Sequence, residues 1–397
     1  MELTRRNFLK SGLALPAAAT LPAFFARAVF ASPPGERVLV LVQLAGGNDG
    51  LNMVVPFEDD AYHRARPSLG LRAGQVVPLR DGIGLHGNLA RLRGSWDSGQ
   101  LAVVQGVGYP NPNRSHFLST DIWHTASLTP PSRWNGWVGR ALDRCCGDGA
   151  EVPGLQLGGQ PLSLALVGER IMVPAVRDAR SFHVQGGAKT ARLLASLVEA
   201  GEGGGEAEYV RRSAQRAYAT AARLEKALTG GRAADGYPGT PLGQQLWQVA
   251  RLVESGLPAR VFSVTLDGFD THSRQKQQHD NLMRALGDAL GAFRDDLVEQ
   301  GLFDRVLVMT YSEFGRRVEE NRSLGTDHGA AAPLLLMGGR VKGGLCGAHP
   351  ALTDLEQGDL KHHTDFRSLY ATVLDDWFGV DPAAVLGSAF PKIAALA

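Results

Sequence analysis

The chain has 397 residues, of which 44% are hydrophobic and 20% charged, and its formal net charge is +1. This composition excludes a largely disordered protein, because such a chain can bury a large core as one big domain or two modest ones. Its three cysteines, two of them adjacent, exclude a disulfide framework and a cysteine-type zinc site.

The N-terminus has the pattern of an export signal. Arg5 and Arg6 precede a mildly apolar stretch, residues 13–30, which ends in small residues suited to cleavage. This resembles a twin-arginine signal, so we expect a signal peptide over residues 1–31, the twin-arginine translocation machinery as a partner, and a periplasmic or secreted protein. An uncleaved anchor is the alternative, whereas cleavage leaves no stable membrane span.

Cleavage also changes the charge of the chain. Removal of residues 1–31 takes away one acidic and four basic residues, so the formal net charge changes from +1 to −2. The mature chain therefore has no electrostatic basis for binding nucleic acid.

The mature chain alternates strand-like and helix-like patterns. Near-continuous apolar runs are typical of strands buried in a parallel sheet, and amphipathic helical stripes lie between them. This alternation predicts an α/β protein, with a single domain over residues 32–397. Glycine-rich breaks set off a predicted helical insertion at about residues 185–257. The strand-like runs are residues 37–45, 101–108, 260–266, 305–311 and 333–339, and the helical stripes are residues 242–253, 282–297 and 366–377.

Polar residues gather where these runs end. In open α/β sheets, ligands bind beyond the carboxyl ends of the strands, so we expect one common rim. Carboxylates and imidazoles are ligands for zinc, manganese or magnesium, with one or two ions at this rim. The residues that follow the first four runs, or precede the fifth, are Asn48, Asp49, Ser115, His116, Asp267, Asp270, His272, Glu313, Asp327 and His328.

Several of these residues also have a structural interpretation. Asp49 lies in "GGNDG", which has the composition of a turn. Ser115 is either a metal-activated nucleophile or the N-cap of a helix. Glu313 is either a ligand or the partner of Arg316 or Arg317.

The histidines leave similar alternatives. Asp270 and His272 are ligands or parts of an Asx-turn with an exposed histidine. His363 is a ligand or simply precedes the cap of the last helix. His279 lies on the apolar stripe of its helix and is interpreted as a core histidine.

Five motifs give a family resemblance. "QLAGGNDGLN", "NRSHF", "GFDTHSRQKQQHDNL", "MTYSEFGRR" and "GTDHGAAAPLLLMGG" resemble the exported bacterial family called domain of unknown function fifteen-hundred-and-one, with Asp267 where that family has glycine. The family is similar in turn to the alkaline phosphatase/sulfatase superfamily. This resemblance implies a three-layer α/β/α fold with a mostly parallel sheet, a two-metal site and a hydroxyl or modified-cysteine nucleophile.

Carried over, the resemblance gives residue roles. Asp49 resembles a metal-bridging aspartate, Ser115 the nucleophile, and Asp270 with His272 the middle ligand set. The C-terminal motifs can be aligned with the superfamily's ligand positions in two ways. In one, Asp327 and His328 are the superfamily's paired ligands, and His363 is the final ligand. In the other, Glu313 and Phe314 replace that pair, and one ligand is lost.

The expected function is metal-dependent hydrolysis of a phosphate or sulfate ester, with Arg114 or Arg316 holding the anion. The formylglycine signature of sulfatases is absent from the sequence. The alternative is a secreted binding or assembly protein with an incomplete metal site. A Rossmann nucleotide-binding protein is disfavoured, because "AGGNDG" does not match G-x-G-x-x-G.

Overall fold

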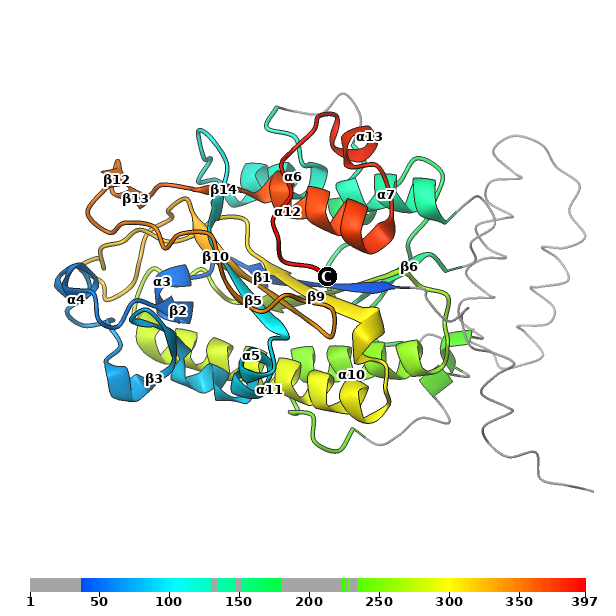
Figure 1. The fold of residues 1–397 in the computed structure, drawn as a ribbon, viewed down its shortest axis with the longest axis horizontal. Helices are drawn as coiled ribbons and strands as arrows, with labels where there is room; N and C mark the ends of the chain where they lie inside the picture. Colours follow the sequence, from blue (N-terminus) through cyan, green and yellow to red (C-terminus); the bar gives the residue numbers. More distant parts are fainter. Residues whose placement is uncertain (1–36, 130–133, 147–151, 180–222, 226, 229–233) are drawn as a thin grey trace, which may run out of the picture.

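The computed structural model describes residues 37–129, 134–146, 152–179, 223–225, 227–228 and 234–397 (Figure 1). The predicted signal peptide and residues 185–222 of the predicted insertion lie outside these residues. Within them, no helix is both long and apolar enough to cross a membrane.

Among the described residues, nine strands form one large sheet in the order β11-β5-β10-β9-β1-β8-β6-β7, with β14 beside β5. All neighbouring pairs are parallel except the two that β10 makes, with β5 and with β9. The predicted mostly parallel sheet is confirmed. Its strands are β1 (Val38–Ala45), β5 (Leu101–Gly108), β6 (Gly154–Leu157), β7 (Ala175–Val176), β8 (Val261–Asp267), β9 (Val306–Tyr311), β10 (Ala332–Gly338), β11 (Gly344–Cys346) and β14 (Thr364–Asp365).

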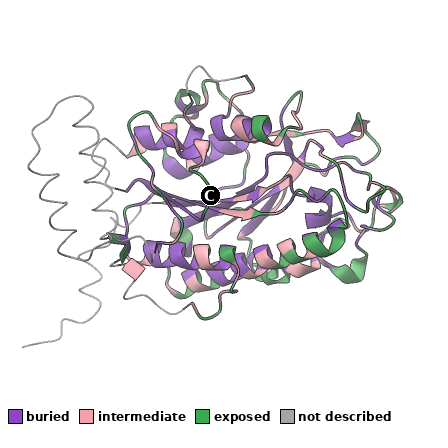
Figure 2. Ribbon diagram, turned by 180° about the vertical axis from the view of Figure 1, so that it is seen from behind, coloured by how far each residue is buried: buried purple, intermediate pink, exposed green. Residues whose placement is uncertain are grey.

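Helices cover both faces of this sheet (Figures 1 and 2). Because successive side chains of a strand point to opposite faces, β1 supplies both cores. Val40 and Val42 pack with the helices α10 and α11, and Leu39 and Leu41 with α6, α7 and α12. The predicted three-layer α/β/α architecture is therefore confirmed. These helices are α10 (Pro241–Glu254), α11 (Gln275–Glu299), α6 (His116–Thr125), α7 (Trp137–Cys145) and α12 (Phe366–Thr372).

The three predicted helical stripes are α10, α11 and α12. The Thr240 side chain accepts a hydrogen bond from the Gly243 amide and caps α10. Helix α10 is the described C-terminal end of the predicted insertion. Because α10 packs against α11 and β8, this end belongs to the main helical layer. After α12, the π-helix η5 (Val373–Phe378) ends at Gly379, whose φ of 67° suits glycine.

The remaining elements are short and lie at the edges of the fold. Two small antiparallel sheets, β2-β4-β3 and β12-β13, accompany them. The elements are α3 (Gly50–Met53), α4 (Asp60–Ala65), α5 (Arg93–Asp97), α13 (Pro382–Leu386), η1 (Ala73–Gln75), η2 (Gly87–Leu92), η3 (Leu164–Leu166), η4 (Phe303–Arg305), β2 (Val54–Val55), β3 (Val76–Arg80), β4 (Ile83–His86), β12 (Leu355–Glu356) and β13 (Asp359–Leu360).

The direction of β10 decides which loops meet. Because β10 runs against its neighbours, the residues that precede it lie at the edge where β1, β8 and β9 end. His328 therefore reaches the same rim as Asp270, which follows β8, and Glu313, which follows β9.

Candidate metal centre

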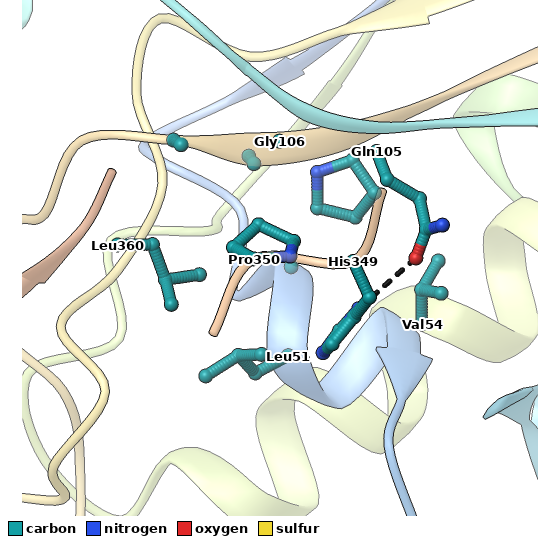
Figure 3. Close-up of a pocket in the computed structure, with 11 residues that line it drawn as sticks. Leu51, Val54, Gln105, Gly106, His349, Pro350 and Leu360 are labelled. Atoms are coloured by element: carbon teal, nitrogen blue, oxygen red, sulfur yellow. Dashed lines mark hydrogen bonds between the residues drawn. The ribbon is translucent and has the colours of Figure 1, made fainter. Parts of the chain in front are cut away.

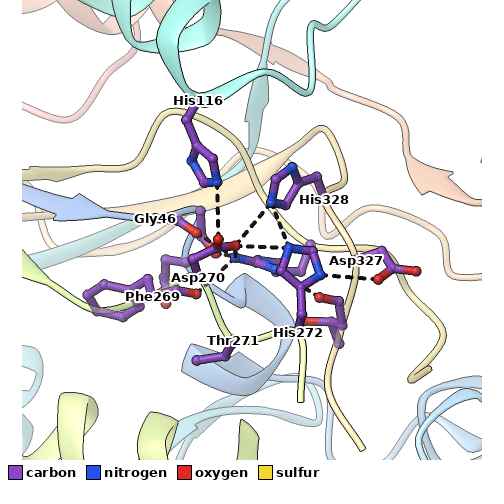
Figure 4. A network of polar contacts seen from close by, with 12 residues as sticks. Gly46, His116, Phe269, Asp270, Thr271, His272, Asp327 and His328 are labelled. Atoms are coloured by element: carbon purple, nitrogen blue, oxygen red, sulfur yellow. Dashed lines mark hydrogen bonds and ion pairs between the residues drawn. The ribbon is translucent and has the colours of Figure 1, made fainter. Parts of the chain in front are cut away.

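Three histidines and one aspartate converge at this rim (Figure 4). His116 is the first residue of α6, whereas Asp270 and His272 lie between β8 and α11. Asp270 Oδ1 is 3.0 Å from both His272 Nε2 and His328 Nε2. His116 Nε2 is 3.5 Å from Asp270 Oδ2.

Each imidazole is held through its other ring nitrogen. His116 Nδ1 lies 2.8 Å from Glu313 Oε1, and the pKa of His116 is raised mainly by this hydrogen bond. Likewise, His328 Nδ1 is 2.9 Å from the Arg114 carbonyl oxygen.

The third imidazole is held in the same way, since His272 Nδ1 is 3.2 Å from Asp327 Oδ1. Carboxylates and carbonyls only accept hydrogen bonds, so an imidazole that binds an ion here carries its proton on Nδ1 and a lone pair on Nε2. In the absence of an ion, His328 Nε2 is instead a hydrogen-bond donor to Asp270 Oδ1 at 3.0 Å. This assignment of tautomers follows from the hydrogen-bond network.

In the form that binds an ion, the Nε2 lone pairs of His272 and His328 face each other and the carboxylate of Asp270. His272 Nε2 and His328 Nε2 are 3.0 Å apart, and two lone pairs at this distance repel unless a proton or a cation lies between them. His116 Nε2 is buried and has no hydrogen-bond partner among the described residues. Histidine nitrogen and carboxylate oxygen are zinc ligands, so the residues present fit a divalent ion.

Two predicted ligands instead hold the histidines. Buried Glu313 accepts a hydrogen bond from the Gly46 amide at 2.9 Å, in addition to the one from His116. Asp327 accepts a hydrogen bond from the Asn321 side chain at 3.1 Å, in addition to the one from His272. Carboxylates that fix a ligating histidine in this way commonly surround metal sites. In the structure Glu313 and Asp327 are hydrogen-bond acceptors of two histidines of the cluster, and their predicted ligand roles stay a prediction.

Arg316 also differs from its predicted role as an anion-binding residue. Its guanidinium is buried and donates to the carbonyls of Gly47, Thr326 and Phe269 at 2.6, 2.8 and 2.9 Å. It also donates to Asp270 Oδ1 at 2.8 Å. Burial alone would raise the pKa of Asp270, but hydrogen bonds from Arg316 and His328 outweigh it and lower that pKa to about 2. Arg316 therefore clamps the ligand loops and keeps Asp270 ionised.

The carboxylate of Asp49 has its own hydrogen-bond partners, and its predicted role as a metal ligand stays a prediction. Arg66 Nη1 donates to its buried carboxylate at 2.6 Å, and Gln275 donates to the same oxygen. Burial would raise the pKa of Asp49, but the charge of Arg66 lowers it overall. The guanidinium of Arg66 thus lies beside Asp49 Oδ2, whereas Asp49 Oδ1 is buried and has no hydrogen-bond partner among the described residues.

Gln275 connects Asp49 to the ligand loops. Its Oε1 accepts hydrogen bonds from Thr271 Oγ1 at 3.0 Å and from Thr326 Oγ1 at 2.6 Å. Thr271 lies between Asp270 and His272 in the sequence, and Thr326 directly precedes Asp327. The buried Arg66–Asp49–Gln275 unit therefore supports both loops.

The remaining predicted site residues lie around the cluster. His363 is exposed, and its backbone amide donates a hydrogen bond to the Gly106 carbonyl at 2.8 Å. Ser115 is the exposed N-cap residue of α6, but its hydroxyl makes no capping hydrogen bond within the described part of the chain. The guanidinium of Arg114 pairs with Asp359.

His116 was the member of the cluster that sequence reasoning placed at the rim but did not select as a ligand. The sequence contained evidence for this role, because His116 comes directly after Ser115, in the segment that follows β5. At this position the sequence pattern predicted a role for Ser115, as the nucleophile, and none for His116 as a ligand.

The small cavity in Figure 3 is not part of the cluster. It lies between Leu51, Val54, Gln105 and Pro350, and its volume of about 10 Å³ is close to that of one water position. His349 Nδ1 bonds Gln105 Oε1 at 3.0 Å beside it. The cavity is too small to hold an ester substrate.

His279 is a buried residue, as its position on the apolar stripe predicted. We expect the protein to lose stability as the pH falls from about 6.5 to about 4. Burial lowers the pKa of His279 from 6.5 to about 4, so in this window the unfolded chain binds a proton that the folded chain does not. The contribution to the free energy of unfolding is about 3 kcal/mol.

Urea unfolding of the metal-free protein at several pH values measures this contribution. The His279→Gln variant should lose less stability than the wild type between pH 6.5 and pH 4. Equal losses in the two proteins would contradict the assigned pKa.

The fold and its rim define an α/β/α protein with a histidine–aspartate cluster at the strand ends. The chain belongs to the family described as "Protein of unknown function (DUF1501)", whose model matches residues 93–390. A twin-arginine translocation signal matches residues 2–22, so the protein is exported. No curated protein matches the sequence.

Solved structures from three bacteria are similar to this chain. The PsFucS1 sulfatase from Pseudoalteromonas sp. is 11% identical, with 94% of this chain and 72% of that chain covered and a TM-score of 0.40. A protein in the alkaline phosphatase superfamily from Vibrio parahaemolyticus is 14% identical, with coverages of 90% and 71% and a TM-score of 0.38.

The third is the C-terminal periplasmic domain of EcEptC from Escherichia coli, in complex with Zn. It is 9% identical, with 77% of this chain and 73% of that chain covered and a TM-score of 0.32. Structural similarity at these TM-scores says nothing about the activity of this chain.

Proposed function

We propose that this exported protein is a metal-dependent hydrolase of a phosphate or sulfate ester. It binds one divalent ion through Asp270, His116, His272 and His328. The observation that carries the proposal is the convergence of three Nε2 atoms on one carboxylate, while each Nδ1 atom is held by an acceptor. Three nitrogen donors favour zinc over magnesium or manganese, which prefer oxygen ligands.

The proposal includes one ion rather than two. The resemblance to the superfamily implied a second ion at Asp49, but Arg66 and Gln275 both donate to that carboxylate. A second cation there would face the buried guanidinium and would be repelled by it.

The residues around the cluster have defined tasks in this reaction. A bound divalent ion would polarise an ester oxygen and lower the pKa of a nearby water or hydroxyl. Glu313 keeps the proton of His116 on Nδ1 and fixes the orientation of the ring, as Asp327 does for His272. Ser115 is the candidate nucleophile, because its exposed hydroxyl is next to His116 and is not used as a cap.

A non-catalytic, ion-binding exported protein is the second candidate. The observation that favours it concerns the two arginines predicted to hold a substrate anion. Arg316 is buried against backbone carbonyls, and Arg114 is paired with Asp359. Arg114 is the better of the two for an anion, since its side chain is 34% exposed.

Metal content and hydrolysis, measured on the same sample, test the proposal. The mature chain, purified without chelators, should contain about one equivalent of zinc and should hydrolyse at least one aryl phosphate or aryl sulfate. Ser115→Ala should keep the zinc and lose the hydrolysis. Full activity in this variant would exclude the serine as nucleophile, and bound zinc without any hydrolysis would favour the binding protein.

A further inference from the structure

Two neighbouring cysteines come together at the end of α7. Side chains at adjacent helical positions do not normally face each other. Here Cys145 is the last residue of the helix, and Cys146 is its C-cap, with φ −111° and ψ −7°. At this helix end, Cys145 Sγ lies 2.9 Å from Cys146 Sγ.

The pair also changes its redox environment during the life of the protein. The twin-arginine signal at residues 2–22 directs export, and the bacterial periplasm keeps disulfides oxidised, whereas the cytoplasm keeps thiols reduced. Both cysteines are half-buried, so neither is enclosed in the core. Thiols that are already in contact would therefore meet an oxidant only after export.

We propose that Cys145 and Cys146 are a covalent modification site, where a disulfide forms between neighbouring residues after export. One cysteine thiolate attacks the disulfide of an oxidised thiol–disulfide oxidoreductase, which gives a mixed disulfide and releases one thiolate of the oxidoreductase. The second cysteine thiolate then attacks the first cysteine sulfur and releases the other. The pair loses two protons and two electrons, and the disulfide of the oxidoreductase accepts the electrons.

This disulfide is reversible rather than a permanent staple. Cα atoms joined by a trans peptide are about 3.8 Å apart, whereas disulfide-linked Cα atoms are usually about 4.4–6.8 Å apart. A bond between neighbours is therefore strained and is reduced more easily than an ordinary structural disulfide.

The position of the pair gives the modification a structural consequence. Asp143, in the same last turn of α7, accepts hydrogen bonds from the amides of Glu169, Arg170 and Ile171 at 2.7, 3.1 and 2.8 Å. The disulfide would fix the end of the helix that holds this segment. It would not touch the metal cluster, so the inference is independent of the proposed hydrolysis.

Differential alkylation of the exported chain tests the proposal. The full-length protein is collected from the exported fraction into acid, alkylated with N-ethylmaleimide while unfolded, and analysed as peptides by mass spectrometry. We expect the peptide with Cys145 and Cys146 to be unalkylated and lighter by two hydrogen atoms, and to become alkylated after treatment with reduced glutathione. Cys346 is the internal control and should be alkylated throughout.

Two matched samples complete the test. The chain without residues 1–31, retained in the cytoplasm, should be alkylated at both positions. The exported Cys145→Ser variant should be alkylated at Cys146. Complete alkylation of both cysteines in the exported wild type would overturn the proposal, and so would disulfide-linked dimers that depend on either residue.

Discussion

Replacing His116 with alanine will weaken zinc binding by more than about 100-fold, whereas His363→Ala will leave it unchanged. His116 Nε2 is a buried atom that faces Asp270, so its removal takes away one of four proposed ligands. Loss of an outer residue that only holds a ligand costs about 10–100-fold in metal affinity, and loss of a ligand costs more. Competition with a chromogenic chelator at neutral pH measures both dissociation constants.

His363 is the matched control, because the family resemblance made it a ligand, whereas in the structure its side chain is exposed and its backbone amide bonds the Gly106 carbonyl. Circular dichroism of the metal-free variants checks that both remain folded. If His363→Ala loses zinc as strongly as His116→Ala, the ligand set read from the structure is wrong, and the alignment that ends at His363 is favoured.

Arg66→Met will destabilise the protein by about 3–5 kcal/mol. The substitution leaves the Asp49 carboxylate buried without its guanidinium partner, and it removes the donors to the carbonyls of Arg317 and Val318. Combining it with Asp49→Asn should recover part of this loss, because the uncompensated charge disappears. Urea unfolding at neutral pH measures the three stabilities.

Arg93→Met provides the comparison, since Arg93 and Asp97 form a pair whose side chains are 48% and 53% exposed. That variant should lose less than about 1 kcal/mol. Zinc should not restore the stability of Arg66→Met. Full restoration by a divalent ion would mean that Asp49 binds a cation once the arginine is removed, and the one-ion assignment would need revision.

The sequence predicted the α/β class and the edge where the site lies, because both depend on local patterns, whereas the three layers were implied by the family resemblance. Continuous apolar runs predicted β1, β5, β8, β9 and β10, and helical stripes predicted α10, α11 and α12. The end of β8 then placed Asp270 and His272 at the rim, and His328 was expected there although it precedes its strand. The direction of β10 has no signature in its own apolar pattern and came only from the structure.

The sequence could not predict which side chains of the site accept hydrogen bonds from the histidines, because this depends on distances between loops. Glu313 and Asp327 have the chemistry of ligands, but the position of each behind a histidine makes it a hydrogen-bond acceptor. Asp49 likewise has ligand chemistry, and its role is decided by Arg66, 17 residues further along the chain. No spacing rule connects these two residues.

The hairpin-like connection between β9 and β10 separates the tuning of the site from the stability of the sheet. These strands are antiparallel neighbours, and the pairing continues beyond them through Arg316 opposite His328 and the Arg317 amide on the Asp327 carbonyl. A segment that leaves and re-enters the sheet at adjacent positions can accept substitutions at the exposed residues of its tip, Arg322 and Ser323, without shifting the register of any strand. Val318 and Asn321 in the same tip hold Arg66 and Asp327 and would have to be kept. Natural variants or designed libraries could therefore reshape this side of the site while every strand of the scaffold stays in place.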